Sequence, residues 1–239
     1  KTTTLYTVLD ILNTPEVNIS TIEDPIEYRM PRINQTQVRP DIGFSFSQGL
    51  RTLVRQDPDI IMVGEIRDNE TAGLAINASL TGHLVLSTLH TNSAAGAMPR
   101  LIDMKAEPFL IASTITAIVA QRLVRQLCPD SRAKYRLNPK EIEVLGKDIN
   151  LEKMLKLLKQ EKIVAPEAAW DSIDFYQPHE SEGCPLGYKG RVGIYEVLNI
   201  TPKIKQLIIS SATSDDIQKA AQEEGMLIML EDGFIKAAQ

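Results

Sequence analysis

The stretch DIIMVGE at residues 59–65 decides the fold that this chain is expected to adopt. Its apolar residues 60–63 are bounded by Pro58 and Gly64, and such a short run is typical of a strand buried on both faces of a parallel sheet. The strand would present Glu65 at its carboxyl end, the edge where open α/β sheets bind ligands. The alternative is an ordinary buried strand followed by a surface carboxylate.

Helix-like and strand-like segments alternate on both sides of this stretch. The alternation favours an α/β fold in which helices cover a mostly parallel sheet. Helices are expected at residues 5–12, 45–56, 71–80 and from about 93 to 127, and strands at residues 17–22, 33–38, 60–63 and 84–89.

The pattern changes after Cys128 and Pro129. Asn138 followed by Pro139 and Glu141 predicts a capped helix start, and residues 151–158 carry an apolar stripe at helical spacing. Residues 165–191 are rich in Pro, Gly and Ser and are expected to form loops with short strands, and further helix starts are expected at Thr201-Pro202 and at residues 213–216. The predicted parts are a core over 1–127, a small subdomain over 128–195 and a helical segment over 196–239.

Composition restricts the function classes. The chain has 239 residues, of which 43% are hydrophobic and 24% charged, an ordinary globular balance. Its net charge of -5 gives no support to a general electrostatic grip on nucleic acid or on an acidic membrane. The two cysteines, together with the lack of a leader pattern and of an apolar run near 20 residues, favour a reduced cytoplasmic compartment.

The first residues, Lys1, Thr2 and Thr3, match the end of a phosphate-binding loop of the form G-x-x-x-x-G-K-[ST]. Such a loop needs a lysine at the helix start to meet the β- and γ-phosphates, and a hydroxyl behind it to hold Mg²⁺. By itself a terminal Lys-Thr carries no weight. With the rest of the chain, it predicts a fragment that begins at the lysine of this loop.

Acidic and histidine residues lie at the ends of two other expected strands. Glu23, Asp24 and Glu27 follow the strand at residues 17–22, and like charges so close together either surround a cation or spread into water. His83 and His90 stand at opposite ends of an apolar strand, roughly 23 Å apart at about 3.3 Å per residue, so both cannot reach one phosphate. His90, at the carboxyl edge, is the better candidate for sensing a γ-phosphate. His83 is expected to orient a turn or to contact a neighbour.

Five segments together carry a family resemblance. They resemble the Asp box, Walker B, His box and C-terminal subdomain of the type II secretion and type IV pilus assembly ATPases. The segments are ISTIEDPIEY (19–28), LRTLVRQDPDIIMVGEIRD (50–68), SLTGHLVLSTLHTN (79–92), EPFLIASTITAIVAQRLVRQLCP (107–129) and GYKGRVGIYEVL (187–198).

The resemblance implies a RecA-like P-loop NTPase core with a small C-terminal subdomain and a helical tail. It also implies a ring, usually of six subunits, with ATP near the subunit boundaries and Mg²⁺ as the cofactor. Carried over by position, the Walker A lysine and hydroxyl are Lys1 and Thr2, the Asp-box glutamate is Glu23, the Walker B glutamate is Glu65 and the His-box histidine is His90. Thr3 follows in the nucleotide-binding segment.

The sequence departs from the family pattern in three places. The glycine-rich half of Walker A and the preceding domain are absent, and the chain ends before the helical tail is expected to finish. The family's metal site uses two C-x-x-C pairs. Here the two corresponding segments keep one cysteine each, Cys128 and Cys184. Tetrahedral zinc needs four ligands, so these residues are candidate ligands of a degenerate site and zinc is not expected.

The Walker B position usually held by a Mg²⁺-linked aspartate is Gly64, which leaves Glu65 to orient or deprotonate the attacking water. The resemblance therefore predicts a cytoplasmic, ATP-hydrolysing motor for pilus assembly or type II secretion. It would act on an inner-membrane platform protein and the pilin-export machinery, held at the inner membrane through these partners. The alternatives are a retraction motor of the same superfamily and a ring or scaffold component without turnover. A nucleic-acid translocase is disfavoured by the charge.

Overall fold

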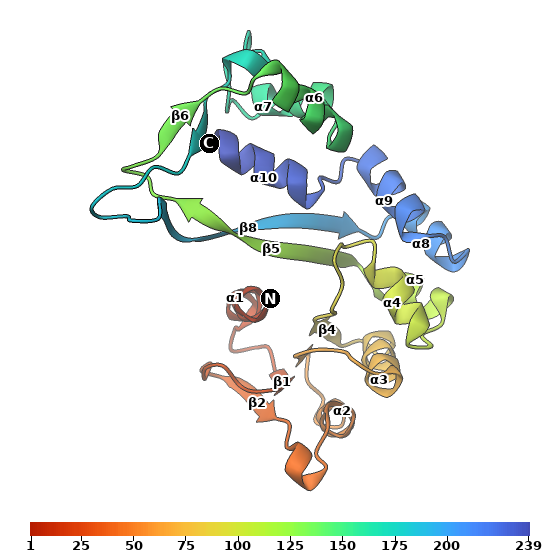
Figure 1. The fold of residues 1–239 in the computed structure, drawn as a ribbon. Coiled ribbons are helices and arrows are strands. Elements are labelled where there is room, and N and C mark those ends of the chain that lie inside the picture. The colour runs from red at the N-terminus through yellow and green to blue at the C-terminus, as the bar shows by residue number, and fades with distance from the viewer. The chain divides into compact units, whose positions relative to one another are not determined.

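The computed structural model describes residues 1–239, which divide into two compact units (Figure 1). The first unit comprises Lys1–Ile118 and Leu198–Ala221, and the second comprises Val119–Val197 and Gln222–Gln239. The chain thus enters the second unit twice, at Val119 and again at Gln222, and ends there. The domain boundaries expected from the sequence stay a prediction.

The first unit is built on a parallel four-stranded sheet in the order β2-β1-β3-β4. Ile22 of β1 is paired with Val63 of β3, and Val63 with Ser87 of β4, so the three strands end at the same edge. This arrangement confirms the predicted α/β class. The strands are β1 (Ile19–Glu23), β2 (Ile33–Gln37), β3 (Ile60–Val63) and β4 (Leu84–Ser87).

Helices cover both faces of this sheet because its central strands are apolar on both sides. Ile60 and Met62 of β3 pack with Tyr6 and Leu9 of α1 on one face. Ile61 and Val63 of β3 pack on the other face with residues of α2 and α3. The helices of the first unit are α1 (Thr2–Leu12), η1 (Pro40–Ile42), α2 (Phe46–Val54), α3 (Asn69–Leu80), α4 (Ala97–Asp103), α5 (Pro108–Thr114), α8 (Pro202–Ile209) and most of α9 (Ser214–Glu223).

The helical segment expected up to residue 127 is wrong in its last part. α5 ends at Thr114, and residues Ala117–Leu127 form strand β5, which pairs with β8 (Tyr188–Asn199). Residues 114–119 contain four β-branched residues besides Val119, which favours an extended chain over a helix. The strand needs its partner β8, which lies far along the chain, so local periodicity alone misassigned it.

The second unit has a small core of its own. Leu158 of α7 and Phe175 of β7 lie in this core, and Phe234 of α10 packs against it. The expected capping box at Asn138 and Glu141 is present at the start of α6. The elements are β6 (Ala133–Tyr135), α6 (Pro139–Asp148), α7 (Leu151–Gln160), η2 (Trp170–Ser172), β7 (Phe175–Gln177) and α10 (Met229–Ala238), with β6 and β7 antiparallel.

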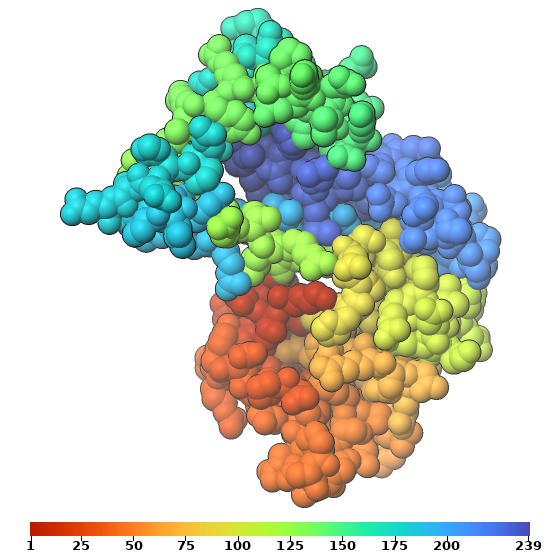
Figure 2. Space-filling model, in the orientation of Figure 1, coloured from red at the N-terminus to blue at the C-terminus, as the bar shows by residue number.

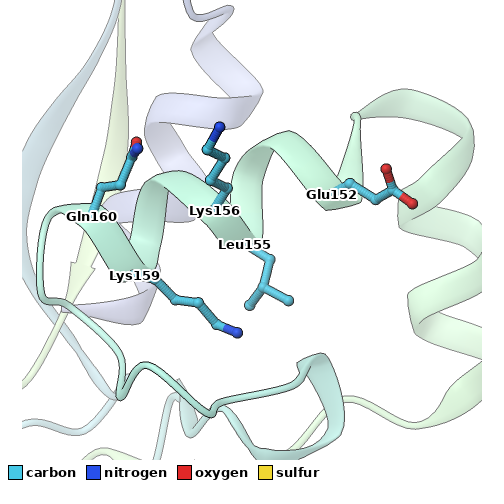
Figure 3. A pocket seen from close by; sticks show the side chains of 5 residues that line it. All are labelled: Glu152, Leu155, Lys156, Lys159 and Gln160. Atoms are coloured by element: carbon cyan, nitrogen blue, oxygen red, sulfur yellow. The ribbon is translucent and has the colours of Figure 1, made fainter.

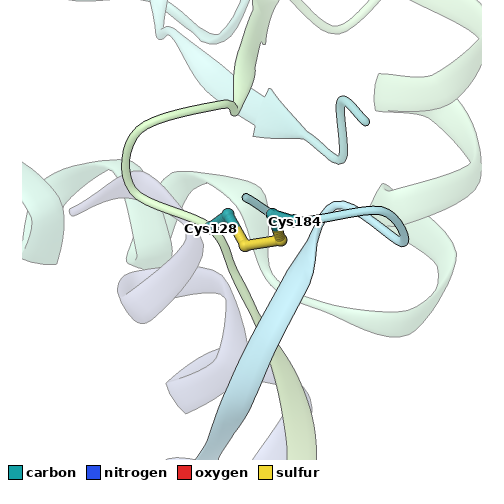
Figure 4. The surroundings of a disulfide bond; sticks show 2 residues. All are labelled: Cys128 and Cys184. Carbon is teal, nitrogen blue, oxygen red and sulfur yellow. A yellow bond between two sulfur atoms is a disulfide. The ribbon is translucent and has the colours of Figure 1, made fainter. Parts of the chain in front are cut away.

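Cys128 and Cys184 are joined by a disulfide bond, which the sequence analysis did not predict (Figure 4). Their Cα atoms lie 6.7 Å apart, within the range that a disulfide bridges. Both side chains are buried, and the backbone N–H of Cys128 donates to the Gly187 carbonyl at 3.1 Å, which fixes the two segments side by side. The expectation of two reduced thiols is therefore wrong for this structure.

None of the helices reaches the length and hydropathy that a membrane-spanning segment requires.

Candidate functional site

Three of the candidate residues gather where the parallel strands end. Glu23 is the last residue of β1, Glu65 follows β3, and His90 follows β4. Backbone hydrogen bonds extend the alignment beyond the strands, because Gly64 N donates to Ile22 O at 2.8 Å and Ile66 N donates to Thr88 O at 3.0 Å. The segments that carry these residues therefore lie next to one another at one edge of the sheet.

Glu65 is held by two basic side chains. His90 Nε2 lies 3.0 Å from Glu65 Oε2, and the Arg67 guanidinium lies 2.6 Å from Glu65 Oε1. The Glu65 side chain is only 12% exposed, whereas those of His90 and Arg67 are 69% and 65% exposed. The carboxylate is thus fixed from the solvent side by groups that are free to change partner when a ligand arrives.

Gly64 leaves room for this arrangement. A Cβ atom at this position would lie 3.3 Å from the carbonyl oxygen of Ile22 and 3.5 Å from Cα of Glu23. The first distance is tighter than an ordinary contact with backbone, so a side chain here would press on β1. The structure accounts for a glycine at the position where Walker B strands usually carry an aspartate.

Lys1 reaches the same edge from the start of α1. Its ammonium donates to the carbonyl of Leu89, the residue before His90. Thr2 and Thr3 are exposed in the first turn of α1, and this helix, red in Figure 2, lies at the surface of the first unit. The helix start thus offers backbone N–H groups, two hydroxyls and one ammonium to an anion.

Glu23 lies on the face of β1 that α1 covers and is 2% exposed. Its carboxylate accepts hydrogen bonds from the Tyr6 hydroxyl, from Thr21 Oγ1 at 2.5 Å and from Gln35 Nε2 at 3.1 Å. Burial, followed by the hydrogen bond to Glu23, raises the pKa of Tyr6 to about 12. Glu23 is therefore a buried, fully hydrogen-bonded carboxylate next to the helix that begins at Lys1.

His83 takes the structural role that the sequence suggested. Its Nδ1 lies 2.9 Å from the Ala78 carbonyl and 3.2 Å from Thr81 Oγ1, in the turn between α3 and β4. His83 thus lies just before the amino end of β4, bonded to the end of α3, whereas His90 follows the carboxyl end of β4.

Sequence reasoning missed three side chains that hold the site together: Tyr6, Gln35 and Arg67. The position of Tyr6 contains a usable signal, because it stands one helical turn after Thr2 on the same face of α1. Arg67, two residues beyond Glu65, is also close enough in sequence to be noticed. Gln35 comes from the neighbouring strand β2. No sequence pattern within β1 or β2 predicts its contact with Glu23.

Mg²⁺ fits the donor set of this edge. Thr2 supplies an exposed hydroxyl at the helix start, one of the oxygen ligands that Mg²⁺ prefers. No cluster of three or more His, Cys, Asp or Glu side chains is placed to hold a metal by itself. The arrangement suits an ion that takes most of its ligands from phosphates and water.

Zinc does not fit the residues proposed for it. Zinc ligation uses cysteine thiolates, and the sulfurs of Cys128 and Cys184 are bonded to each other. The candidate assignment of these two residues as degenerate zinc ligands is therefore withdrawn for the disulfide form.

A shallow pocket of about 500 Å³ lies along α7 in the second unit (Figure 3). Leu155 and Lys159 point to one side of the helix, and Lys156 and Gln160 to the other. It contains none of the residues that the sequence analysis assigned to nucleotide binding or catalysis, and its lining comes from one helix.

Comparison with known proteins gives a match over the whole chain. The family described as "Type II/IV secretion system protein" matches residues 1–239. The type II secretion system protein E of Xanthomonas campestris pv. campestris is 46% identical over 237 residues, which cover 99% of this chain and 39% of that protein. The type IV pilus assembly ATPase PilB of Pseudomonas aeruginosa is 44% identical over 239 residues, covering 100% of this chain and 39% of that protein.

This chain therefore spans about two fifths of the length of these curated relatives. Among solved structures, the pilus retraction motor PilT with bound ADP aligns with a TM-score of 0.57 at 25% identity, covering 98% of this chain and 57% of that one. The ATPase DotB of Legionella pneumophila aligns with a TM-score of 0.60 at 22% identity, covering 99% of this chain and 52% of that one, a likeness of fold alone. The predicted RecA-like P-loop core is confirmed.

Proposed function

Since the chain belongs to the Type II/IV secretion system protein family, we propose that it is the catalytic core of an ATP-hydrolysing motor. The reaction is ATP plus water to ADP plus phosphate. The motor would work in type IV pilus assembly or type II secretion, as its relatives of 44% and 46% identity are named for these systems. The proposal also includes a homo-oligomeric ring, of six subunits by family resemblance, and an inner-membrane platform protein as the partner.

The observation that carries the proposal is the convergence of Lys1, Glu65 and His90. The Lys1 ammonium contacts the residue before His90, and His90 contacts Glu65. A cation for phosphate oxygens thus lies at the same sheet edge as a carboxylate that can take a proton from water. P-loop ATPases need this combination, because their catalysis is mainly positioning and electrostatic stabilisation.

Each residue has a distinct part in the proposed reaction. The Lys1 ammonium exchanges the Leu89 carbonyl for the β- and γ-phosphate oxygens, where it offsets their charge. Glu65 accepts a hydrogen bond from the attacking water and takes its proton as the water oxygen bonds to the γ-phosphorus. The bond between that phosphorus and the bridging oxygen breaks in the same step, and the oxygen leaves with ADP. His90 and Arg67 hold the Glu65 carboxylate, and both would turn toward phosphate when nucleotide binds.

Mg²⁺ would be held by Thr2 and the phosphates, and when bound it would neutralise charge on the phosphate oxygens. Glu23 would stand beside this site as a second carboxylate, aligned by the donors that surround it. Cleavage removes the γ-phosphate contacts of Lys1 and His90, which releases the segments that they join. That release is how hydrolysis would become movement.

The site residues do not distinguish a motor for pilus assembly or secretion from a motor for pilus retraction, but a genetic experiment does. The retraction motor PilT is less similar, at 25% identity, than the assembly and secretion relatives. A deletion strain tests this directly: we expect loss of surface pili or of secreted enzymes, and an excess of non-retracting pili would instead support a retraction motor. A ring component without turnover would show normal assembly when Glu65 is replaced.

The enzymatic proposal is tested by phosphate release from ATP in the full-length protein that contains this chain. We expect Mg²⁺-dependent release in the wild type, and loss of nucleotide binding together with release in Lys1→Ala. Lys140→Ala, which removes an exposed lysine from the start of α6, serves as the matched control and should behave as wild type. Absence of ATP hydrolysis by the wild type, or full activity of Lys1→Ala, would contradict the proposal.

A further inference from the structure

The donors to the Glu23 carboxylate come from two different layers of the fold. Thr21 belongs to β1 itself and Gln35 to the adjacent strand β2, so both are parts of the sheet. Tyr6 alone belongs to a helix, α1, whose first residues carry the phosphate-binding groups. The hydroxyl of Tyr6 thus donates the side-chain hydrogen bond that links this helix to Glu23.

The Tyr6 side chain is rigidly placed. It is 1% exposed, and its ring packs edge-on against Tyr28 with the centroids 4.6 Å apart and the planes at 82°. Its hydroxyl donates to Glu23 Oε2 and accepts the backbone N–H of Glu27 at 3.3 Å, so it also contacts the acidic segment after β1. Since the pKa of Tyr6 is raised to about 12, the hydroxyl remains a donor at neutral pH.

Helix geometry connects this hydrogen bond to the nucleotide. Residues one turn apart lie on the same face of a helix, so Tyr6 stands directly behind Thr2 in α1. The first turn is already formed, because Leu5 N donates to Lys1 O at 3.0 Å. Any shift of the start of α1 as it takes up phosphate is therefore passed through one rigid turn to the Tyr6 hydroxyl.

We propose that Tyr6 is a positioning residue. It orients the Glu23 carboxylate relative to the start of α1, where the phosphate-binding groups lie. In this role Tyr6 touches neither nucleotide nor water. It acts through Glu23, whose two other donors hold the carboxylate to the sheet while Tyr6 holds it to the helix. The inference rests on the proposed ATPase function, since it assigns Glu23 a part in turnover.

The experiment is a double-mutant cycle in the full-length protein with Tyr6→Phe and Glu23→Gln. Tyr6→Phe keeps the ring and removes the hydroxyl, and we expect kcat to fall by roughly 10-fold with KM changed by less than about twofold. In the Glu23→Gln background, Tyr6→Phe should lower kcat by less than about twofold further, because the residues act as one unit. An unchanged kcat in Tyr6→Phe, or the same fall in both backgrounds, would overturn the proposal.

Tyr28→Phe is the matched control, because it removes a phenol hydroxyl from the ring packed on Tyr6 and leaves the Glu23 donors in place. We expect wild-type kcat from this variant, and a loss equal to that of Tyr6→Phe would count against the proposal.

A second measurement is independent of turnover and of how well Tyr6→Phe folds. A ¹³C label on the Tyr6 ring reports its titration, and in the wild type the pKa should be about 12. Glu23→Gln should lower this pKa toward the ordinary tyrosine value of about 10. An unchanged titration would overturn the inference, whereas absence of ATP hydrolysis in the wild type would overturn the proposed function and leave the Tyr6 to Glu23 contact standing.

Discussion

His90 Nε2 lies 3.0 Å from Glu65 Oε2, although the two residues follow different strands of the sheet. Strands β3 and β4 are paired in register, which brings the segments that follow them together. The acid is largely buried and the histidine is mostly exposed, so the histidine can turn to a ligand while the acid stays in place. The pair therefore fits the roles that we propose, with His90 as the γ-phosphate sensor and Glu65 as the fixed catalytic carboxylate.

Replacing His90 by alanine should slow turnover more than it weakens binding. Glu65 would keep Arg67 as its partner but lose the group that responds to the γ-phosphate. We expect kcat to fall on the order of 10-fold to 100-fold, toward the lower range of general acid–base effects. Steady-state ATPase kinetics measure this. His83→Ala is the control, since His83 bonds the Ala78 carbonyl in a turn, and an equal loss there would count against the assignment.

Two glycines in helices of the first unit should respond in opposite ways to alanine. At Gly49 in α2, a Cβ would lie 3.0 Å from Cγ1 of the fully buried Ile22 and 3.3 Å from Phe44 Cζ. Gly49→Ala should therefore destabilise the fold by about 1–3 kcal/mol through overpacking. A Cβ added at Gly73 in α3 would meet no neighbouring atom within 4 Å. Gly73→Ala should therefore stabilise the fold by about 0.5–1 kcal/mol. Urea unfolding measures both, and equal effects would refute this packing of α2.

The disulfide between Cys128 and Cys184 should contribute to stability. The two residues are separated by 56 positions, and closing a loop of this size restricts the unfolded chain by about 2–4 kcal/mol. Purified protein should show no free thiols until it is reduced, and dithiothreitol should lower its Tm. The Cys128→Ser variant cannot form the bond, so its Tm should equal that of the reduced wild type whether or not dithiothreitol is present. Two free thiols in the unreduced folded protein would contradict the bond.

The raised pKa of Tyr6 predicts an alkaline loss of stability. The folded-state pKa of about 12 lies above the unfolded value of 10.0, so the contribution is complete below about pH 10 and is lost as pH rises toward 12. The difference in unfolding free energy between wild type and Tyr6→Phe should therefore shrink between about pH 9 and pH 11.5. Urea titrations at these pH values measure it. A constant difference would show that Glu23 and burial do not hold this proton.

Local sequence was enough to predict several elements in both units. The apolar residues 60–63, bounded by Pro58 and Gly64, form a strand buried on both faces, and Asn138 with Glu141 caps a helix as expected. These features depend on neighbours in the chain, where spacing reveals them. Strand β5 depends instead on β8, and the disulfide on two cysteines 56 positions apart, so neither could be read from a local pattern.

In the candidate site, too, the features that local sequence shows could be predicted, and the contacts set by tertiary packing could not. Lys1, Glu65 and His90 could be placed together because parallel strands end at one edge and the helix start faces it. The partners of Glu23 could not, since Tyr6 and Gln35 reach it from separate elements whose relative heights are set by packing. Residue types and spacing thus located the candidate site, whereas tertiary packing determined which side chains surround its residues.

The central claim is that Glu65 performs the proton-accepting step of ATP hydrolysis at this edge. Its most direct test is the rate of phosphate release by full-length Glu65→Gln, with the affinity for ATP measured on the same sample. Glu70→Gln, an exposed glutamate paired with Arg51, makes the same chemical change away from the site. We predict that Glu65→Gln lowers kcat by about 100-fold or more while ATP binding stays within a few-fold of wild type. Hydrolysis by Glu65→Gln at the wild-type rate would contradict the account.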